Sequence, residues 1–108
     1  MDEILEKIKT DQIIPPGLLA DYKMKLSAEY SFRSSKLEEI LRQKPDAWLE
    51  IRQREEINSD KQADRLWEAT AFGKEEMSLK MQLKRIDKVI SSISTRLRIY
   101  DREAKSQY

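Results

Sequence analysis

Hydrophobic residues in the last third of the chain recur in alternating steps of four and three. From residue 79 to residue 104 this pattern has no interruption, and a strict seven-residue repeat is typical of a helix pressed along a narrow seam against other helices. We therefore predict an all-α fold with a long, coiled-coil-like C-terminal helix, on whose first half shorter N-terminal helices pack. The predicted seam consists of Leu79, Leu83, Ile86, Ile90, Ile93, Leu97, Tyr100 and Ala104.

Prolines divide the chain ahead of this helix. A short amphipathic helix belongs to an N-terminal arm, residues 1–14, which we expect to be either separately docked or mobile, because Pro15-Pro16 cannot continue a helix. Lys44-Pro45 interrupts the next segment, and a proline suits the first position of a new helix. Residues 15–108 are predicted to form a single helical domain with helices at about 17–43, 45–57 and 60–102.

Single residues between positions 48 and 76 allow further predictions. Ser59 followed by Gln62 fits a capping box at the start of the predicted 60–102 helix. Gly73 has two interpretations, since an interior glycine costs a helix roughly 1 kcal/mol relative to alanine and could instead end one helix before another begins. Trp48 and Trp67 are expected in a small core. Glu76 falls on the seam itself, where an acid is costly unless it is paired.

The seam could contact either another copy of the chain or the helix predicted at 17–43. That helix has no matching heptad repeat, so we expect self-association through the C-terminal helix, as a dimer or a tetramer. The alternative is that the seam is covered within one chain. The pattern does not decide whether the associated helices run parallel or antiparallel.

The composition argues against catalysis. Neither cysteine nor histidine is present, which removes the thiol nucleophile, the usual general base and the commonest metal ligands. The acidic residues are scattered over predicted helices without a pocket-forming loop to gather them. We therefore expect no enzyme activity, no catalytic residue, no cofactor and no metal site.

Charge is distributed unevenly although the whole chain carries a net charge of only +1. Residues 74–108 hold nine Lys/Arg and five Asp/Glu. Cations and hydroxyls alternate on the face away from the seam, which would suit phosphate contacts in sequence-independent nucleic-acid binding. The simpler interpretation is a solvated outer face. The candidate nucleic-acid contacts are Lys84, Arg85, Lys88, Arg98, Arg102 and Lys105.

The run from Ser59 to the C-terminus, which includes Ala63-Asp64-Arg65, Trp67 and Gly73, resembles small helical proteins encoded by phages and prophages of Gram-positive bacteria, near recombination and single-strand-binding functions. The resemblance implies a phage origin and a role either as an accessory of DNA metabolism or as an inhibitor of a host protein. The matching positions are Ser59-Asp60, Ala63-Asp64-Arg65, Trp67, Ala69-Thr70, Gly73, Glu75, Leu83-Lys84, Asp87-Lys88, Ser91 and Glu103-Ala104.

No leader and no run of eighteen apolar residues is present, so we expect a protein of the bacterial host cytoplasm without a membrane partner. The favoured function is that of a non-enzymatic, phage-encoded interaction protein that self-associates. One alternative is a nucleic-acid-binding accessory of phage recombination or replication that uses the basic face. Another is an inhibitor of a host defence protein, docking through the arm or the acidic 45–57 helix.

Overall fold

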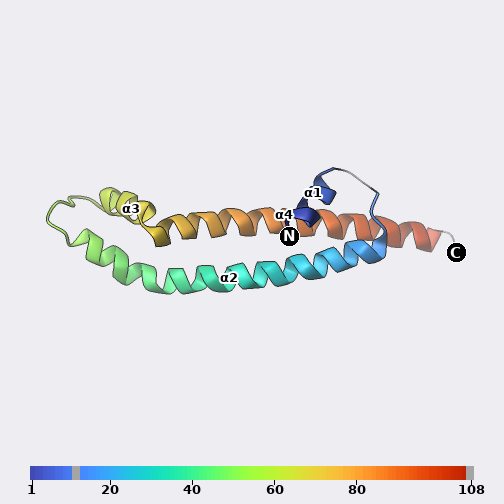
Figure 1. Ribbon diagram of the computed structural model, residues 1–108, viewed down its shortest axis with the longest axis horizontal. Coiled ribbons are helices and arrows are strands. Elements are labelled where there is room, and N and C mark those ends of the chain that lie inside the picture. Colours follow the sequence, from blue (N-terminus) through green and yellow to red (C-terminus); the bar gives the residue numbers. More distant parts are fainter. Residues whose placement is uncertain (11–12, 107–108) are drawn as a thin grey trace. The chain divides into compact units, whose positions relative to one another are not determined.

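The computed structural model describes residues 1–10 and 13–106, and the regular structure within them is entirely helical, as predicted. Residues 11–12 of the predicted arm and 107–108 of the predicted domain lie outside this description. Four helices follow one another along the chain (Figure 1). They are α1 (Asp2–Lys9), α2 (Pro16–Arg52), α3 (Asp60–Ala69) and α4 (Ala71–Ser106).

Contacts divide the chain into two units, and both long helices contribute to each of them. Unit 1 comprises Met1–Phe32 and Lys84–Tyr108, and unit 2 comprises Arg33–Leu83. Each unit has its own cluster of buried apolar side chains.

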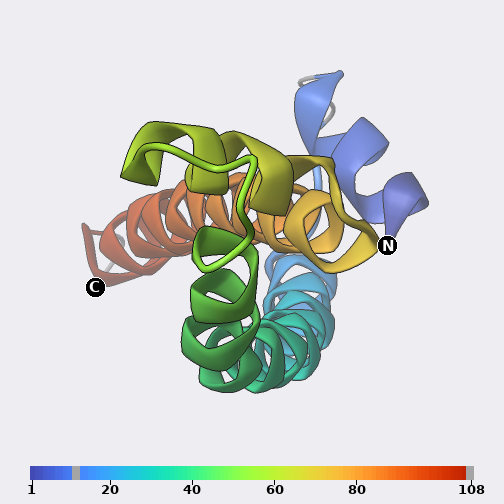
Figure 2. The same ribbon diagram turned by 90° about the vertical axis from the view of Figure 1, so that its left-hand side faces the viewer.

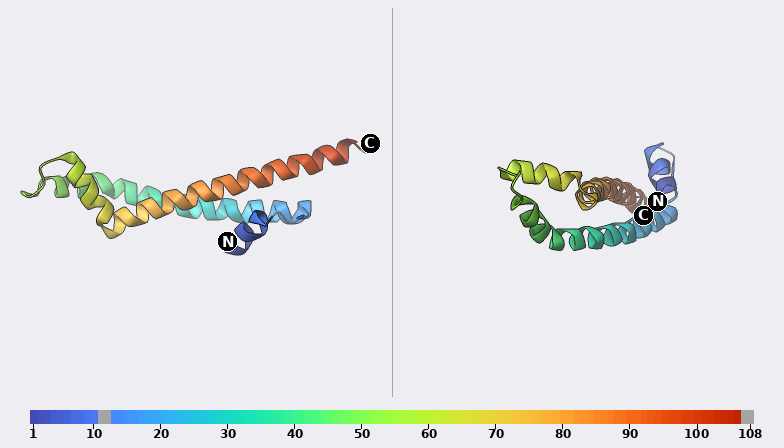
Figure 3. Two further views of the ribbon diagram at one scale, coloured as in Figure 1. Left: turned by 90° about the horizontal axis from the view of Figure 1, so that it is seen from above. Right: turned by 60° about the vertical axis from the view of Figure 1, so that its left-hand side comes forward.

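The core of unit 1 lies between α1, the first part of α2 and the later part of α4. These parts of α2 and α4 run in opposite directions beside each other (Figures 1 and 3). Apolar residues of α2 at helical spacing meet the seam of α4. Four side chains are fully buried there, namely Leu19, Leu26, Ile86 and Ile93, and Leu5, Ile8, Ile14 and Tyr22 complete the buried cluster.

The arm is docked in unit 1. Its helix, α1, buries Leu5 and Ile8 on one face, and its acids at the start and lysines at the end complement the helix dipole. Two side chains of α4 bind the arm backbone: Arg96 Nη2 donates to the Ile8 carbonyl at 3.3 Å, and the Tyr100 hydroxyl donates to the Ile14 carbonyl at 3.0 Å. Of the two alternatives for the arm, the structure shows the docked one.

The core of unit 2 gathers residues from α2, α3, the loop between them and the start of α4. Helix α3 runs across the direction of the start of α4 (Figure 2). Trp67 is buried, and Trp48 is half-buried with its indole N–H donating to Asp64 at 2.8 Å, which confirms the expected core position of both tryptophans. The buried cluster consists of Ile40, Ile51, Ile57, Ala63, Trp67 and Leu79.

Pro45 does not end a helix, which corrects the predicted boundary between 17–43 and 45–57. Helix α2 continues through Pro45 to Arg52 and bends in its later part (green in Figure 1). A proline inside a helix leaves the carbonyl of the fourth residue before it without its amide donor. That residue is Leu41, and both Leu41 and Pro45 are exposed, so water can satisfy the carbonyl. The Ile40 and Ile51 side chains keep the segments before and after Pro45 in the unit 2 core.

The predicted 60–102 helix is two helices, and the break lies at Thr70 rather than at Gly73. The Ser59 half of the predicted capping box is confirmed, because the Ser59 hydroxyl accepts the Gln62 N–H at 3.2 Å. The Gln62 side-chain oxygen accepts the N–H of Asn58 at 2.7 Å rather than that of Ser59. Thr70 is extended and caps α4: its hydroxyl accepts the Gly73 N–H at 3.0 Å and donates to the Trp67 carbonyl.

Gly73 is helical, in the first turn of α4, and is buried. A Cβ on this residue would lie 1.8 Å from the Trp67 carbonyl oxygen. Glycine is therefore required by the close approach of the end of α3, not by a left-handed backbone.

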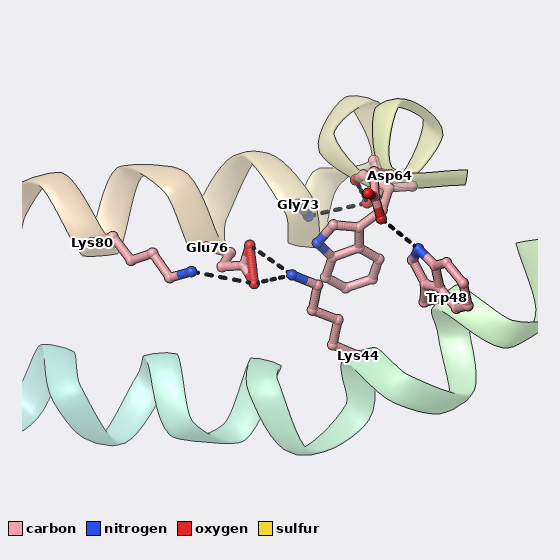
Figure 4. Close-up of polar contacts among 8 residues, drawn as sticks. Lys44, Trp48, Asp64, Gly73, Glu76 and Lys80 are labelled. Atoms are coloured by element: carbon pink, nitrogen blue, oxygen red, sulfur yellow. Dashed lines mark hydrogen bonds and ion pairs between the residues drawn. The ribbon is translucent and has the colours of Figure 1, made fainter. Parts of the chain in front are cut away.

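Glu76 is the buried acid of unit 2, and its partner comes from α2. Lys44 Nζ lies 2.8 and 3.3 Å from the two carboxylate oxygens, and Lys80 Nζ lies 3.9 Å away (Figure 4). Lys44 Nζ also lies 5.7 Å from the centre of the Trp67 ring. Burial raises the pKa of Glu76, but its hydrogen bonds and attraction to Lys44, with the charge of Lys80, outweigh burial and hold that pKa below 4.5.

We predict that Gly73→Ala destabilises the protein although Gly73 is helical. The new methyl group would collide with backbone atoms of α3, so the free energy of unfolding should fall by more than about 1 kcal/mol. Gly17→Ala is the matched control, because Gly17 lies in the first turn of α2 with open space around its Cβ position. Urea denaturation should show this control unchanged or slightly stabilised. A stabilised Gly73→Ala variant would contradict the close approach.

We predict that Glu76→Gln lowers the free energy of unfolding by about 1–3 kcal/mol at pH 7, because Lys44 loses its charged partner. The folded pKa of Glu76 is lowered, so its contribution is complete above about pH 4.5 and is lost as the pH falls through the folded value. Denaturation of both proteins from pH 7 to pH 3 should therefore show the difference shrinking only in acid. Glu75→Gln, at the exposed neighbour, is the control; a Glu76→Gln effect independent of pH would contradict the assignment.

Candidate nucleic-acid interface

Of the eight predicted seam residues, four are buried and three are half-buried within a single chain. Leu79 and Leu83 are buried in unit 2, whereas Ile86 and Ile93 are fully buried in unit 1. Ile86 and Ile93 therefore leave no surface for a second copy. Ile90, Leu97 and Tyr100 are half-buried against the unit 1 core, and Ala104 is exposed.

The six candidate nucleic-acid contacts, in contrast, are all exposed on α4. Lys105 Nζ lies 3.2 Å from Asp101 in an exposed ion pair, which contributes little stability. The other five, Lys84, Arg85, Lys88, Arg98 and Arg102, have no ion pair within residues 1–10 and 13–106. Their charges are therefore available to an external anion.

Five of these cations share one line along α4 with two hydroxyl residues. The positions alternate in steps of four and three, as the seam does, so they lie above one another on the helix surface. All seven are exposed and none is acidic. We name this line the basic stripe, and it consists of Lys84, Lys88, Ser91, Thr95, Arg98, Arg102 and Lys105.

Arg85, the sixth cation, lies beside the stripe at a pocket between α1 and α4. The pocket has a volume of about 300 Å³, and its apolar lining comes from Leu5, Ile8 and Val89. Its polar lining consists of Lys9, Arg85, Lys88 and the half-buried Ser92. We name it the α1–α4 pocket. Among the described residues, no acidic side chain lines it.

Lys9 is the member of this group that sequence reasoning missed. It is an ordinary exposed lysine in the last turn of α1, and nothing in its local pattern distinguishes it. Only the docking of α1 on α4 places it beside Arg85 and Lys88.

A second pocket, between α1 and α2, has a volume of about 280 Å³ and a different charge. Lys25 and Glu29 both line it, together with apolar side chains of Met1, Ile4, Leu26 and Ala28. An acid beside the cation makes this pocket a poorer site for an anion than the α1–α4 pocket.

Comparison with protein-family models, with curated proteins and with solved structures gives no match. The function must therefore be argued from the geometry of this chain.

The described part of the chain presents cations and hydroxyl groups to solvent. It contains no cluster of three or more acidic side chains arranged to hold a metal ion. None of its helices has both the length and the apolar character needed to cross a lipid bilayer. The basic stripe on the later part of α4 presents positive charge and hydroxyl groups, which bind anions.

Proposed function

We propose that this chain is a non-enzymatic helical interaction protein that binds nucleic acid through the basic stripe. The observation that supports this proposal most is the alignment of exposed cations and hydroxyls, without an acid among them, on one line of α4. Lysine, arginine and hydroxyl side chains are the usual donors to phosphate oxygens. A line of them favours a phosphate backbone over a single small anion.

Binding through the stripe should be independent of base sequence. The stripe contains no aromatic side chain on which a base could stack, and its donors suit phosphates rather than base edges. Affinity should then depend on the number of phosphates contacted and fall steeply with salt.

The nucleic-acid alternative ranks above self-association through the seam because of burial. Ile86 and Ile93 already pack inside unit 1, so a second copy would have to displace α1 or α2 to reach them. The stripe needs no such rearrangement, since its side chains are exposed.

We predict that the triple variant Lys84→Gln, Arg98→Gln, Arg102→Gln binds a single-stranded oligonucleotide more weakly than the parent at low salt. Three phosphate contacts are removed, so the slope of log affinity against log salt concentration should fall in magnitude by about 2. Fluorescence anisotropy over a series of salt concentrations measures both quantities.

The matched control for this experiment is Arg54→Gln, Lys61→Gln, Arg65→Gln. These three cations are exposed in unit 2 and carry the same total charge. The control should keep the parent's affinity and salt slope. Equal losses of affinity in both variants would show that the effect depends only on net charge. Absence of binding by the parent would refute the proposed function.

Self-association through another face of α4 is the second candidate, and one observation favours it. Met77 and Met81 are one helical turn apart in unit 2 and are 51% and 68% exposed. Exposed apolar side chains that share a helix face favour protein–protein contact, and methionine adapts its shape to such surfaces.

Under this second candidate, the parent should be a dimer or larger in light scattering at micromolar concentration. The double variant Met77→Gln, Met81→Gln should be a monomer, because polar side chains of similar length replace the apolar contact. Met24→Gln, at a methionine of unit 1 that is also 68% exposed, should leave the assembly intact. A monomeric parent would exclude self-association at that concentration.

The phage origin and the inhibition of a host defence protein stay predictions. Leu5 and Ile8 of the docked arm are buried in the core of unit 1 and are therefore not exposed to a partner. The predicted 45–57 helix is the end of α2 followed by a loop.

A further inference from the structure

The α1–α4 pocket differs from the basic stripe in how it presents charge. The stripe offers one cation or hydroxyl at each step along a single helix. The pocket instead brings Lys9 from α1 together with Arg85 and Lys88 from α4, around a space of about 300 Å³. Three cations and the Ser92 hydroxyl therefore line one open site.

We propose that the α1–α4 pocket binds the terminal phosphate of a nucleic-acid strand. This inference rests on the proposed function, since it names the part of the surface that receives the strand end.

Charge is the first argument. A phosphate monoester at a strand end carries about −1.5 to −2 at pH 7, as phosphorylated side chains do, whereas each phosphodiester inside a strand carries −1. Three lining cations, with no acid among the described lining residues, match the more highly charged group. Arg85 can bind two phosphate oxygens at once, and the lysines supply point charges.

The lining and the volume are the second argument. Leu5, Ile8 and Val89 give the pocket an apolar wall without aromatic side chains, so it suits the carbon face of a sugar better than a stacked base. A volume of about 300 Å³ is at the small end of ligand sites. The pocket thus suits one terminal group, independent of the base it carries.

Continuity with the stripe is the third argument. Lys88 belongs to both features, because it lines the pocket and is a member of the basic stripe. A strand whose end occupies the pocket can therefore place its next phosphates along α4.

The docking of α1 maintains this arrangement. Leu5 and Ile8 are buried against the seam, and Arg96 donates to the Ile8 carbonyl, next to Lys9. Because that carbonyl already accepts a hydrogen bond, less of the negative end of the α1 dipole remains to oppose an anion.

The test compares oligonucleotides of one sequence that carry a 5′-phosphate, a 3′-phosphate or hydroxyls at both ends. A hydroxyl-ended strand that is two nucleotides longer controls for added charge. For the parent protein, one of the two phosphorylated strands should bind about tenfold more tightly than both hydroxyl-ended strands, which is the effect of one strong charge-assisted contact. The phosphorylated oligonucleotide that binds more tightly identifies which end of the strand occupies the pocket.

Two double variants then locate the preference. Lys9→Gln with Arg85→Gln should reduce the ratio of the affinity for the preferred phosphorylated strand to the affinity for the hydroxyl-ended strands to about one. Arg98→Gln with Arg102→Gln, on the stripe, should weaken binding of every strand and leave that ratio unchanged. All four side chains are exposed, and denaturation midpoints equal to the parent's would verify that the variants are folded.

Three results would overturn the inference. Equal affinity of the parent for phosphorylated and hydroxyl-ended strands would refute the pocket while leaving nucleic-acid binding in place. A preference that survives in the Lys9→Gln, Arg85→Gln variant would place the end site elsewhere. Absence of binding to any strand would refute the proposed function and the pocket together.

Discussion

The covering of the apolar seam of α4 is the constraint on which the two units depend. A single helix cannot bury a continuous line of leucine and isoleucine, and water contact with such side chains is unfavourable by roughly 25 cal/mol per Å². In unit 1 the start of α2 and the docked α1 provide the cover, and in unit 2 the later part of α2 does so with α3. Because each cluster is small, every covering element matters to its stability.

The same constraint determines which surface remains for function. Once the seam faces inward, the opposite side of α4 must face solvent, and from residue 84 onward that side carries the lysine, arginine, serine and threonine side chains of the basic stripe. The docking of α1 has a second effect, since the helix that closes the core also brings Lys9 to Arg85 and Lys88. Core packing and the candidate binding pocket therefore depend on the same contacts.

In unit 2, specific contacts stabilise a buried acid and a sharp turn. Glu76 occupies a position where an apolar residue is expected, and burying its charge is tolerable because Lys44 of α2 binds both carboxylate oxygens. The chain must also turn sharply between α3 and α4. Thr70 satisfies the free backbone groups there, and Gly73 lets the carbonyl of Trp67 approach the first turn of α4.

The sequence by itself determined the helical class, the buried face of α4, the Ser59 cap and the exposed cations, because these follow from local periodicity and side-chain chemistry. It did not determine what covers the seam. Heptad spacing shows that Ile86 and Ile93 need an apolar neighbour but is the same whether that neighbour is α1, α2 or another copy. Pro45 and Thr70 show the same limit, since a proline on the exposed side of α2 is tolerated and a threonine becomes a cap only where α3 ends. Likewise, the ion pair of Glu76 with Lys44, and the pocket that Lys9 and Arg85 both line, join residues far apart in the chain. Only tertiary packing brought those residues together.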